Sequence, residues 1–461
     1  MQGQLPTLLH RLSKEMMTRI RAAREDGSVI HARVQYVKDE VGDFGYDLGR
    51  GISLSTSRVL VEKQEWEWKH ELGLYDAIER VKEEVPDYSL CVSEIGRGYQ
   101  VTDGQADFWL TQFLQSVAGA AVDAEAGDEF LVDHVATLIR DLDQATLDWN
   151  VELWLLGVWL EGDSYVIEDD FLLRRPRPSD FEGEVPFDQL MRQPPSPFPP
   201  RTPTAILEFG CRSSAQLDVQ LETETVLRVL RLFRLGSVAS PRQRLWAKSI
   251  LTPPTQIYCT STPATPYQYT LTAVDLDSFR AFLRKMRPLL RHYPAYGPSA
   301  HITDAVSIAL QRYEDALLLS PATPEARITS AVACLEALYL RGKERGELSH
   351  RLSQRASAML GLFAVRPLKA YTELSRGYEV RSTFVHGSRL EEDLRGLVPK
   401  LSQAIPEYSR VSLVTFMQLL RDPVDEEKER LLNRLDNSLL DEKALRKVKR
   451  LLEDDSLVIP L

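Results

Sequence analysis

The stretch Pro324–Leu340, PEARITSAVACLEALYL, decides the fold of the C-terminal part of this 461-residue chain. Its apolar residues Ile328, Val332, Leu335 and Tyr339 recur at spacings of four, three and four. Residues at these spacings lie on one face of an α-helix, so the stretch predicts an amphipathic helix. Such a helix is stable when another element covers its apolar stripe.

Four further segments in the same part of the chain show helical periodicity. The connections are short and polar, as in Arg341-Gly342-Lys343, and short connections favour antiparallel neighbours in a helical bundle. The charged sequence beyond Asp422 is expected to form a helical tail on the surface or against a partner subunit. The four segments are residues 302–319, 347–362, 367–385 and 391–421.

The N-terminal part of the chain mixes strand and helix patterns. Residues 152–173 predict a β-hairpin with a turn at Glu161-Gly162-Asp163, and residues 129–142 have apolar residues at helical spacing. Nine prolines between Pro176 and Pro203 predict a linker or surface loop. The expected fold class is α+β, with five parts in chain order: a mixed α/β N-terminal region (1–175), the Pro-rich linker or loop (176–203), a second part of the mixed region (204–299), an all-α helical bundle (300–422) and the charged helical tail (423–461).

The composition is that of an ordinary globular protein, with 43% hydrophobic and 27% charged residues. A formal net charge of −11 argues against a protein that coats nucleic acid, although it allows a local basic site. The four cysteines are scattered without zinc-site spacing, and neither a metal nor a cofactor is expected. The N-terminus does not resemble a signal peptide, and the most apolar run, Leu153–Leu160, is too short to cross a bilayer. A cytoplasmic protein without membrane contact is therefore expected.

The segment RSTFVH, Arg381 to His386, places an arginine and a histidine five positions apart. It ends a long amphipathic segment, and Gly387 follows as the expected C′ residue of the helix. Metal-free RNA cleavage needs the 2′-hydroxyl deprotonated and the leaving oxygen protonated, and histidine can do either near neutral pH. It also needs a cation beside the phosphate, and arginine supplies a permanent, planar one.

The spacing alone is a weak signal, because Arg287–His292 and Arg345–His350 share it. Arg24–His31 has a slightly wider gap. Arg287 precedes a proline outside the bundle, and Arg345–His350 straddles a turn, whereas Arg381–His386 ends a helix. Residues five apart on a helix point roughly 140° apart, so one straight helix cannot aim both at one phosphate. Either the helix frays at His386, or the pair meets its counterparts across a two-fold axis.

The surrounding sequence resembles the Apea-like branch of the HEPN superfamily over residues 300–422. The resemblance is carried by ACLEALYL (Ala333–Leu340) and by ELSHRLSQRASAMLG (Glu347–Gly361). A Tyr-x-x-Arg-Ser-x-x-Val-His-Gly string then begins at Tyr378. This combination is far more specific than an arginine and a histidine at a fixed gap.

The resemblance implies a helical bundle that dimerises and forms a composite RNA-cleaving site from two Arg/His pairs. Arg381 is then the phosphate-binding and charge-stabilising group, and His386 is the acid/base. Ser382 occupies a slot in which many active relatives have Asn, His or Asp. Supporting roles are expected for Ser382, Glu336, Arg355 and Tyr378.

Two basic stretches are candidates for RNA contact. Residues 341–390 hold ten Lys and Arg against four acidic residues, which suits an RNA backbone, and a solvated face is the alternative. Residues 225–274 hold no acidic residue, and their arginines could contact RNA, a phosphate-bearing ligand or acidic residues elsewhere in this protein. On a helix predicted near 222–235, Arg228, Arg231 and Arg234 share one stripe. The residues expected to bind RNA are Arg341, Arg345, Arg351, Arg376 and Arg389.

The resemblance therefore predicts a metal-independent endoribonuclease. Families of this kind serve prokaryotic anti-phage defence by abortive infection or act as toxins. The N-terminal region is then expected to be a sensor or regulator that answers a phage-derived or protein trigger. RNA and a second copy of the chain, in a homodimer, are the expected partners. The alternative is a non-catalytic HEPN module that dimerises or binds RNA or protein.

Overall fold

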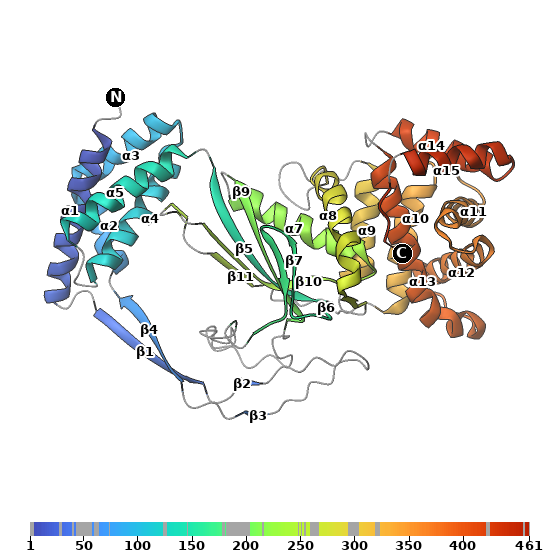
Figure 1. Cartoon of the computed structure of the whole chain (residues 1–461), viewed down its shortest axis with the longest axis horizontal. Coiled ribbons are helices and arrows are strands. Elements are labelled where there is room, and N and C mark those ends of the chain that lie inside the picture. Colours follow the sequence, from blue (N-terminus) through green and yellow to red (C-terminus); the bar gives the residue numbers. More distant parts are fainter. Residues whose placement is uncertain are drawn as a thin grey trace.

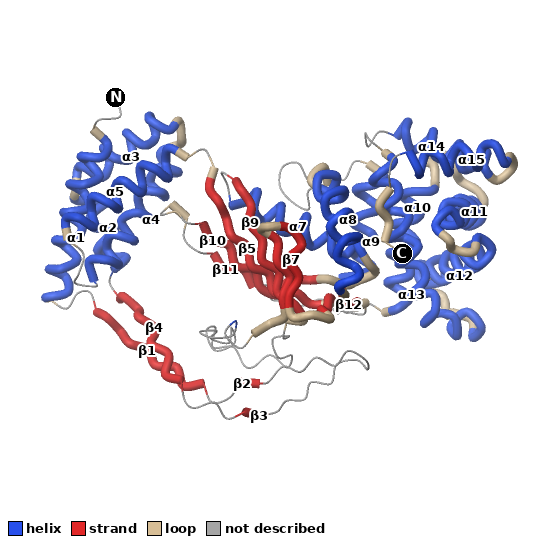
Figure 2. Tube along the Cα trace, viewed as in Figure 1, coloured by secondary structure: helices blue, strands red, loops and turns tan. Residues whose placement is uncertain are grey.

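The computed structural model has three parts in chain order: helices at the N-terminal end, an antiparallel sheet, and a second group of helices at the C-terminal end (Figure 1). Figure 2 shows the strands of the sheet, in red, between the two helical parts. The fold class is α+β, as the sequence predicts. The structure describes residues 4–26, 30–38, 41–42, 58–59, 64–72, 74–122, 127–144, 146–177, 180, 203–213, 216–247, 249, 251–252, 255–258, 267–293, 304–318, 323–420, 425–454 and 457–460.

The N-terminal helices pack around a core of their own. In α1 (Leu5–Glu25), Leu9, Leu12, Met16 and Ile20 are fully buried at helical spacing, so they form its inner stripe. Strand β1 pairs antiparallel with β4, and β2 with β3. The other elements of this part are β1 (Ile30–Lys38), β2 (Val41–Gly42), β3 (Arg58–Val59), β4 (Gln64–Leu72), α2 (Leu74–Glu84), α3 (Pro86–Tyr99), α4 (Asp103–Val122) and α5 (Asp128–Asp143), the last confirming the helix predicted over 129–142.

The middle of the chain forms an antiparallel sheet with the strand order β11-β10-β5-β9-β8-β7. In its strand β5 (Leu147–Leu156), Trp149, Val151, Leu153 and Leu155 are buried in alternation, because successive side chains of a strand point to opposite faces. Helices α7 and α8 pack on the sheet. The bounds are β7 (Ser164–Glu168), β8 (Phe171–Arg174), β9 (Ala205–Ser213), α7 (Gln216–Phe233), β10 (Ala239–Ala247), β11 (Thr255–Tyr258), η2 (Ala273–Asp275) and α8 (Leu276–Leu290).

The hairpin predicted over residues 152–173 is wrong. Strand β6 (Val158–Leu160) leaves the main sheet and pairs in parallel with β12 (Tyr269–Leu271), while the local hairpin joins β7 to β8. The change of direction occurs at Gly157, whose φ is +84° and where a Cβ would lie 2.6 Å from the carbonyl oxygen of Ser237. Only glycine fits such a position without strain.

The Pro-rich stretch predicted to be a linker or loop lies largely outside the described residues, which omit 178–179 and 181–202. The strands on either side of it, β8 and β9, pair antiparallel in the main sheet. The two predicted parts of the N-terminal region, 1–175 and 204–299, therefore both contribute strands to this sheet.

The C-terminal helices follow the ranges that the sequence predicts. In α10 (Pro324–Tyr339), the Thr323 hydroxyl caps the helix by accepting from the Ala326 N–H at 3.3 Å, and the four residues of the predicted stripe are fully buried. Its neighbours are α9 (Ala305–Leu318), α11 (Leu348–Leu360), η3 (Gly361–Phe363), α12 (Pro367–Val385) and α13 (Glu392–Leu419), followed by α14 (Asp425–Ser438) and α15 (Glu442–Asp454) in the tail.

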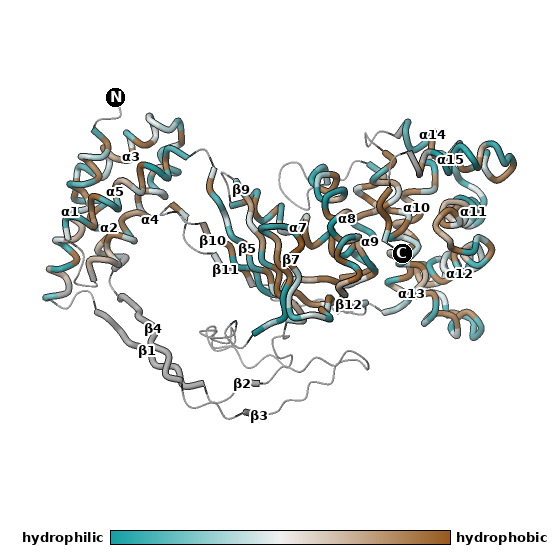
Figure 3. Tube along the Cα trace, viewed as in Figure 1, coloured by the Kyte–Doolittle hydropathy of each residue, from teal (hydrophilic) through white to brown (hydrophobic). Residues whose placement is uncertain are grey.

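Buried apolar side chains form two clusters, one in the N-terminal helices and one that runs from the sheet into the C-terminal bundle. Figure 3 shows hydrophobic segments, in brown, along the strands, α7 and α10. The second cluster is reinforced by Arg410 of α13, which is buried and donates to the carbonyl oxygens of Leu232 and Phe233, both at 2.9 Å. The C-terminal bundle is thus anchored on α7 and, through it, on the sheet.

Candidate active site

A Schellman motif ends α12 directly after the predicted catalytic pair. His386 is the C-cap residue, and Gly387 follows with a φ of +66°, which confirms it as the C′ residue. The Ser388 N–H donates to the Thr383 carbonyl oxygen at 3.0 Å, the long hydrogen bond of this motif. His386 is exposed, and the described residues give its ring no hydrogen-bond partner. The motif therefore fixes the backbone under an accessible imidazole.

Arg381 lies against α10 rather than beside His386. Its Nη2 is 3.0 Å from Oε2 of Glu336, and the two side chains are 29% and 18% exposed. The guanidinium also lies 5.6 Å from the ring centroid of Tyr378, whose hydroxyl hydrogen-bonds to the Glu336 carboxylate. Arg381 is thus oriented by a carboxylate and by an aromatic ring.

The charges around Arg381 are partly compensated. Burial raises the pKa of Glu336, while the positive charge of Arg381 and the Tyr378 hydrogen bond act in the opposite direction. Burial and the neighbouring Glu336 raise the pKa of Tyr378, so its hydroxyl stays a donor at neutral pH. The Nε of Arg381 is buried without a hydrogen-bond partner among the described residues. Glu336 therefore leaves part of the donor set of this guanidinium unused.

Arg355 and Arg341 belong to a different network, which ties the α10–α11 connection to α14. Arg355 is 2% exposed, lies 2.8 Å from Glu344 and 2.6 Å from Asp436, and donates to the Tyr339 carbonyl oxygen. Arg341 pairs with the same two acids, at 3.0 and 2.8 Å. Burial opposes ionisation of Glu344, yet hydrogen bonds from both arginines lower its pKa to about 2. No described contact joins this network to Arg381, so Arg355 does not support the site directly.

The other arginines expected to bind RNA are accessible. Arg345 is exposed and donates to backbone carbonyl oxygens of its own turn. Arg351 and Arg376 each pair with an acidic residue, at 3.3 and 2.8 Å, and keep about half of their side-chain surface exposed. Arg389 is exposed just beyond the end of α12. Arg341 is the exception in this set, because three acidic residues surround it.

The basic stripe of α7 is neutralised inside the protein. Arg228 and Arg231 both pair with Glu314 of α9, at 2.8 and 2.7 Å, and Arg234 pairs with Asp275 at 2.5 Å. Arg228 and Arg231 are buried. The alternative that these arginines contact acidic residues of this protein is therefore confirmed.

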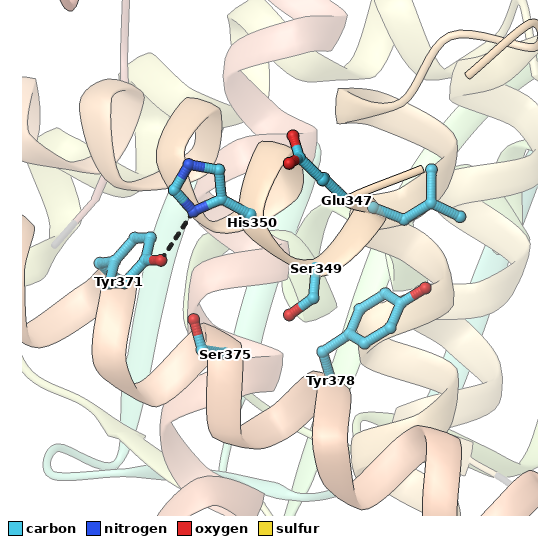
Figure 4. A pocket seen from close by; sticks show the side chains of 7 residues that line it. Glu347, Ser349, His350, Tyr371, Ser375 and Tyr378 are labelled. Atoms are coloured by element: carbon cyan, nitrogen blue, oxygen red, sulfur yellow. Dashed lines mark hydrogen bonds between the residues drawn. The ribbon is translucent and has the colours of Figure 1, made fainter. Parts of the chain in front are cut away.

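A pocket of about 640 Å³ lies between the start of α11 and α12 (Figure 4). On one side, Nδ1 of His350 is 2.9 Å from the hydroxyl of Tyr371, and the two rings are nearly perpendicular. Ser375 and Tyr378 continue the α12 side at spacings of four and three residues, so they share one helix face with Tyr371. Tyr378 also contacts the guanidinium of Arg381, so this one side chain borders both the pocket and the arginine.

Sequence reasoning missed this pocket. It considered His350 as the second half of an Arg/His pair and gave Tyr371 and Ser375 no role. The available signal was the row of polar and aromatic residues at positions 371, 375 and 378, on the same face of the helix as Ser382.

Comparisons with protein-family models, curated proteins and solved structures gave no match. Among the described residues, no three His, Cys, Asp or Glu side chains gather in a way that could hold a metal ion. Within the same residues, no helix is both long and apolar enough to cross a membrane.

Proposed function

We propose that this protein is a metal-independent endoribonuclease of the HEPN type, with Arg381 and His386 as its catalytic residues. The observation that carries the proposal is the C-terminal end of α12. There, a guanidinium oriented by Glu336 and Tyr378 precedes an accessible histidine whose backbone is fixed by a Schellman motif. A preoriented cation beside an acid/base group is what cleavage of a phosphodiester requires.

The reaction is an internal transfer within the RNA. A base removes the proton of the 2′-hydroxyl, and the 2′-oxygen attacks the adjacent phosphorus. The bond from phosphorus to the 5′-oxygen then breaks, and an acid protonates that oxygen. The products carry a 2′,3′-cyclic phosphate and a 5′-hydroxyl. Arg381 stabilises the charge that develops on the phosphate oxygens, and His386 carries a proton.

Two copies of the chain are needed to complete this site. Arg381 is turned toward α10, whereas His386 lies at the exposed helix end, and the described contacts do not join them. A two-fold axis near the end of α12 would bring the histidine of one protomer to the arginine of the other. Phe384 and Val385, 43% and 56% exposed beside His386, offer apolar surface for that contact.

The proposal assigns regulation to the N-terminal region. Its helices have a hydrophobic cluster separate from that of the sheet and the C-terminal bundle, so they can respond to a ligand as a unit. In the proposed role, a phage-derived or protein trigger bound there releases RNA cleavage in the cytoplasm, as in abortive infection or toxin action.

A second candidate function is a non-catalytic HEPN module that dimerises or binds RNA or protein. The observation in its favour is the Arg381–Glu336 ion pair, which joins α12 to α10 and can serve as a structural link. The two candidates differ in what Arg381→Ala does. If Arg381 is a structural link, its removal lowers the stability of the fold. If Arg381 is catalytic, its removal lowers the rate of RNA cleavage.

The test is incubation of the full chain with single-stranded RNA in excess EDTA. We expect cleavage products with 2′,3′-cyclic phosphate and 5′-hydroxyl ends. Strict dependence on added Mg²⁺ or Mn²⁺, or 5′-phosphate ends, would contradict the mechanism. Mixing Arg381→Ala with His386→Ala protein tests the composite site, because a mixed dimer retains one arginine and one histidine and should recover part of the activity that each variant lacks alone.

A further inference from the structure

We propose that the pocket between α11 and α12 binds a guanine base of single-stranded RNA beside the phosphate that Arg381 holds. The inference rests on the proposed function, because it names the nucleotide that the same site would select. It concerns Glu347, Ser349, His350, Tyr371, Ser375 and Tyr378, which line the pocket (Figure 4).

The lining suits an unstacked base. The pocket volume of about 640 Å³ lies within the range of small-ligand sites. Three rings, those of His350, Tyr371 and Tyr378, contribute to its walls. Proteins that read single-stranded RNA stack its bases on aromatic side chains and hydrogen-bond the base edges.

Glu347 supplies the preference for guanine. It precedes α11 with a φ of +56°, a conformation that residues other than glycine rarely adopt, and this conformation fixes its position at the pocket. Its side chain is exposed, and the described residues give its carboxylate no partner. Among the four bases, guanine presents two adjacent N–H donors, at N1 and N2, which match the two oxygens of a carboxylate. A carboxylate at the pocket also repels a phosphate, which leaves the base as the occupant.

His350 can read the other edge of the same base. When the Tyr371 hydroxyl donates to Nδ1 of His350, the hydrogen of the neutral ring lies on Nε2. Guanine carries acceptors at O6 and N7, so this N–H has a partner in the proposed ligand. Ser349 adds a hydroxyl that can donate or accept.

Tyr378 connects the base pocket to the phosphate. The Tyr378 ring packs against the guanidinium of Arg381 and also lines the pocket. A nucleotide whose base enters the pocket therefore has its phosphate directed toward Arg381. Cleavage would then occur next to guanosine, so the pocket sets where the RNA is cut.

The test measures binding without cleavage. Four of the probes are fluorescent 2′-O-methyl tetranucleotides that differ in the base at one position. They lack the 2′-hydroxyl nucleophile, so they cannot be cleaved. The fifth probe is guanosine monophosphate. We expect the guanine probe to bind about 10-fold more tightly than the other three, the usual discrimination of a bidentate contact. Guanosine monophosphate should bind more weakly than the tetranucleotide; equal affinity would contradict RNA as the source of the base.

Three variants locate the binding, and a fourth is their control. Glu347→Gln should remove the guanine preference, and Tyr371→Ala should weaken the guanine probe about 10-fold through lost stacking. Glu426→Gln, which removes an exposed carboxylate on α14 outside the pocket, is the control and should bind like wild type. Melting temperatures of all variants check that they fold. Tyr371→Phe, which keeps the ring and removes the hydroxyl, should lose affinity for guanine specifically.

The outcomes separate this inference from the proposed function. RNA cleavage that depends on His386, with Glu347→Gln and Tyr371→Ala binding all four probes like wild type, would overturn the pocket and leave the ribonuclease standing. Guanine binding that depends on Glu347, in a protein that never cleaves RNA, would support the pocket and overturn the ribonuclease. A wild-type protein that binds the four tetranucleotides equally overturns the pocket assignment.

Discussion

The arginine stripe of α7 and the arginine at the end of α12 have similar positive charge but opposite surroundings. Arg231 is buried, with Glu224 at 2.5 Å, Glu314 at 2.7 Å and the Val238 carbonyl oxygen at 2.8 Å as its acceptors. Arg381 is 29% exposed, and Glu336 is the single acid that pairs with it among the described residues. The first arginine is saturated by the protein, and the second retains capacity for a ligand.

This difference shows that local charge density is a poor guide to nucleic-acid contact. Residues 225–274 lack acidic residues, yet their α7 arginines are neutralised by acids from α9 and η2. The accessible arginines of the set expected to bind RNA lie instead on or beside α11 and α12.

The largest expected change in stability follows from Arg231→Ala. The substitution removes the buried ion-pair partner of Glu224 and Glu314. Breaking a buried ion pair in this way lowers the free energy of unfolding by about 3–5 kcal/mol. Chemical denaturation of the full chain should show this loss in the unfolding free energy. Arg376→Ala, which removes an exposed cation on α12, is the control and should change stability by about 0–1 kcal/mol. Equal stability of the two variants would mean that the α7 stripe is not structural.

Arg381→Ala should act on catalysis rather than on stability. Removing the cation beside the phosphate should lower the rate of RNA cleavage about 10²–10³-fold. Arg381→Lys should restore only part of the rate, because the ammonium lacks the planar fork of donors. The measurement is single-turnover cleavage, with the melting temperature determined in parallel. Unchanged cleavage would contradict the catalytic role of Arg381. A large fall in melting temperature, in a protein whose wild type does not cleave RNA, would favour the non-catalytic module.

Glu344 should make the fold sensitive to acid. Its pKa of about 2 lies below the ordinary value of 4.5, so its stabilising effect is complete above pH 4.5 and is lost as the pH falls toward 2. The shift corresponds to about 3 kcal/mol. Glu344→Gln should therefore lower the unfolding free energy at pH 7 and show a weaker decline between pH 5 and 2. Glu426→Gln, at an exposed site, is the control. A wild-type stability that is flat over this range would contradict the network.

Glu336→Gln should change the stability of the fold only slightly. The raised pKa of Glu336 means that the fold disfavours its charged form, so wild type loses stability relative to the glutamine variant as the pH rises through that pKa. At neutral pH the two should differ by about 1 kcal/mol or less. Glu336 is a positioning residue, and its effect on KM should differ in kind from its effect on kcat. Loss of its charge should lower KM for RNA, because the guanidinium loses a competing anion, and should lower kcat, because Arg381 is no longer held in place. A kcat equal to that of wild type would contradict this role.

The C-terminal helices were predictable from sequence because their apolar periodicity is local. Ile328 and Val332 form the predicted stripe, and α12 ends at its predicted capping glycine, Gly387. Strand pairing is not local, and the hairpin prediction failed for that reason. Strand β5 pairs with β9 and β10, which come after the Pro-rich stretch.

The candidate site was predictable only in part. The motif located Arg381 and His386, and the preceding helix supplied Glu336, which does contact the arginine. Arg355 was indistinguishable from a site residue by position, but the acids of the α10–α11 connection and α14 engage it. The pocket residues His350 and Tyr371 come together from two helices, a contact that no local pattern of either helix reveals.

The most direct test of the central claim compares two histidines with the same sequence spacing from an arginine. His386 ends α12, whereas His292 is exposed near the end of α8 and belongs to the Arg287–His292 pair. RNA cleavage in EDTA should fall about 10²–10⁴-fold in His386→Ala, the usual contribution of a general acid or base. His292→Ala should cleave like wild type. Full cleavage by His386→Ala would contradict the assignment of the site.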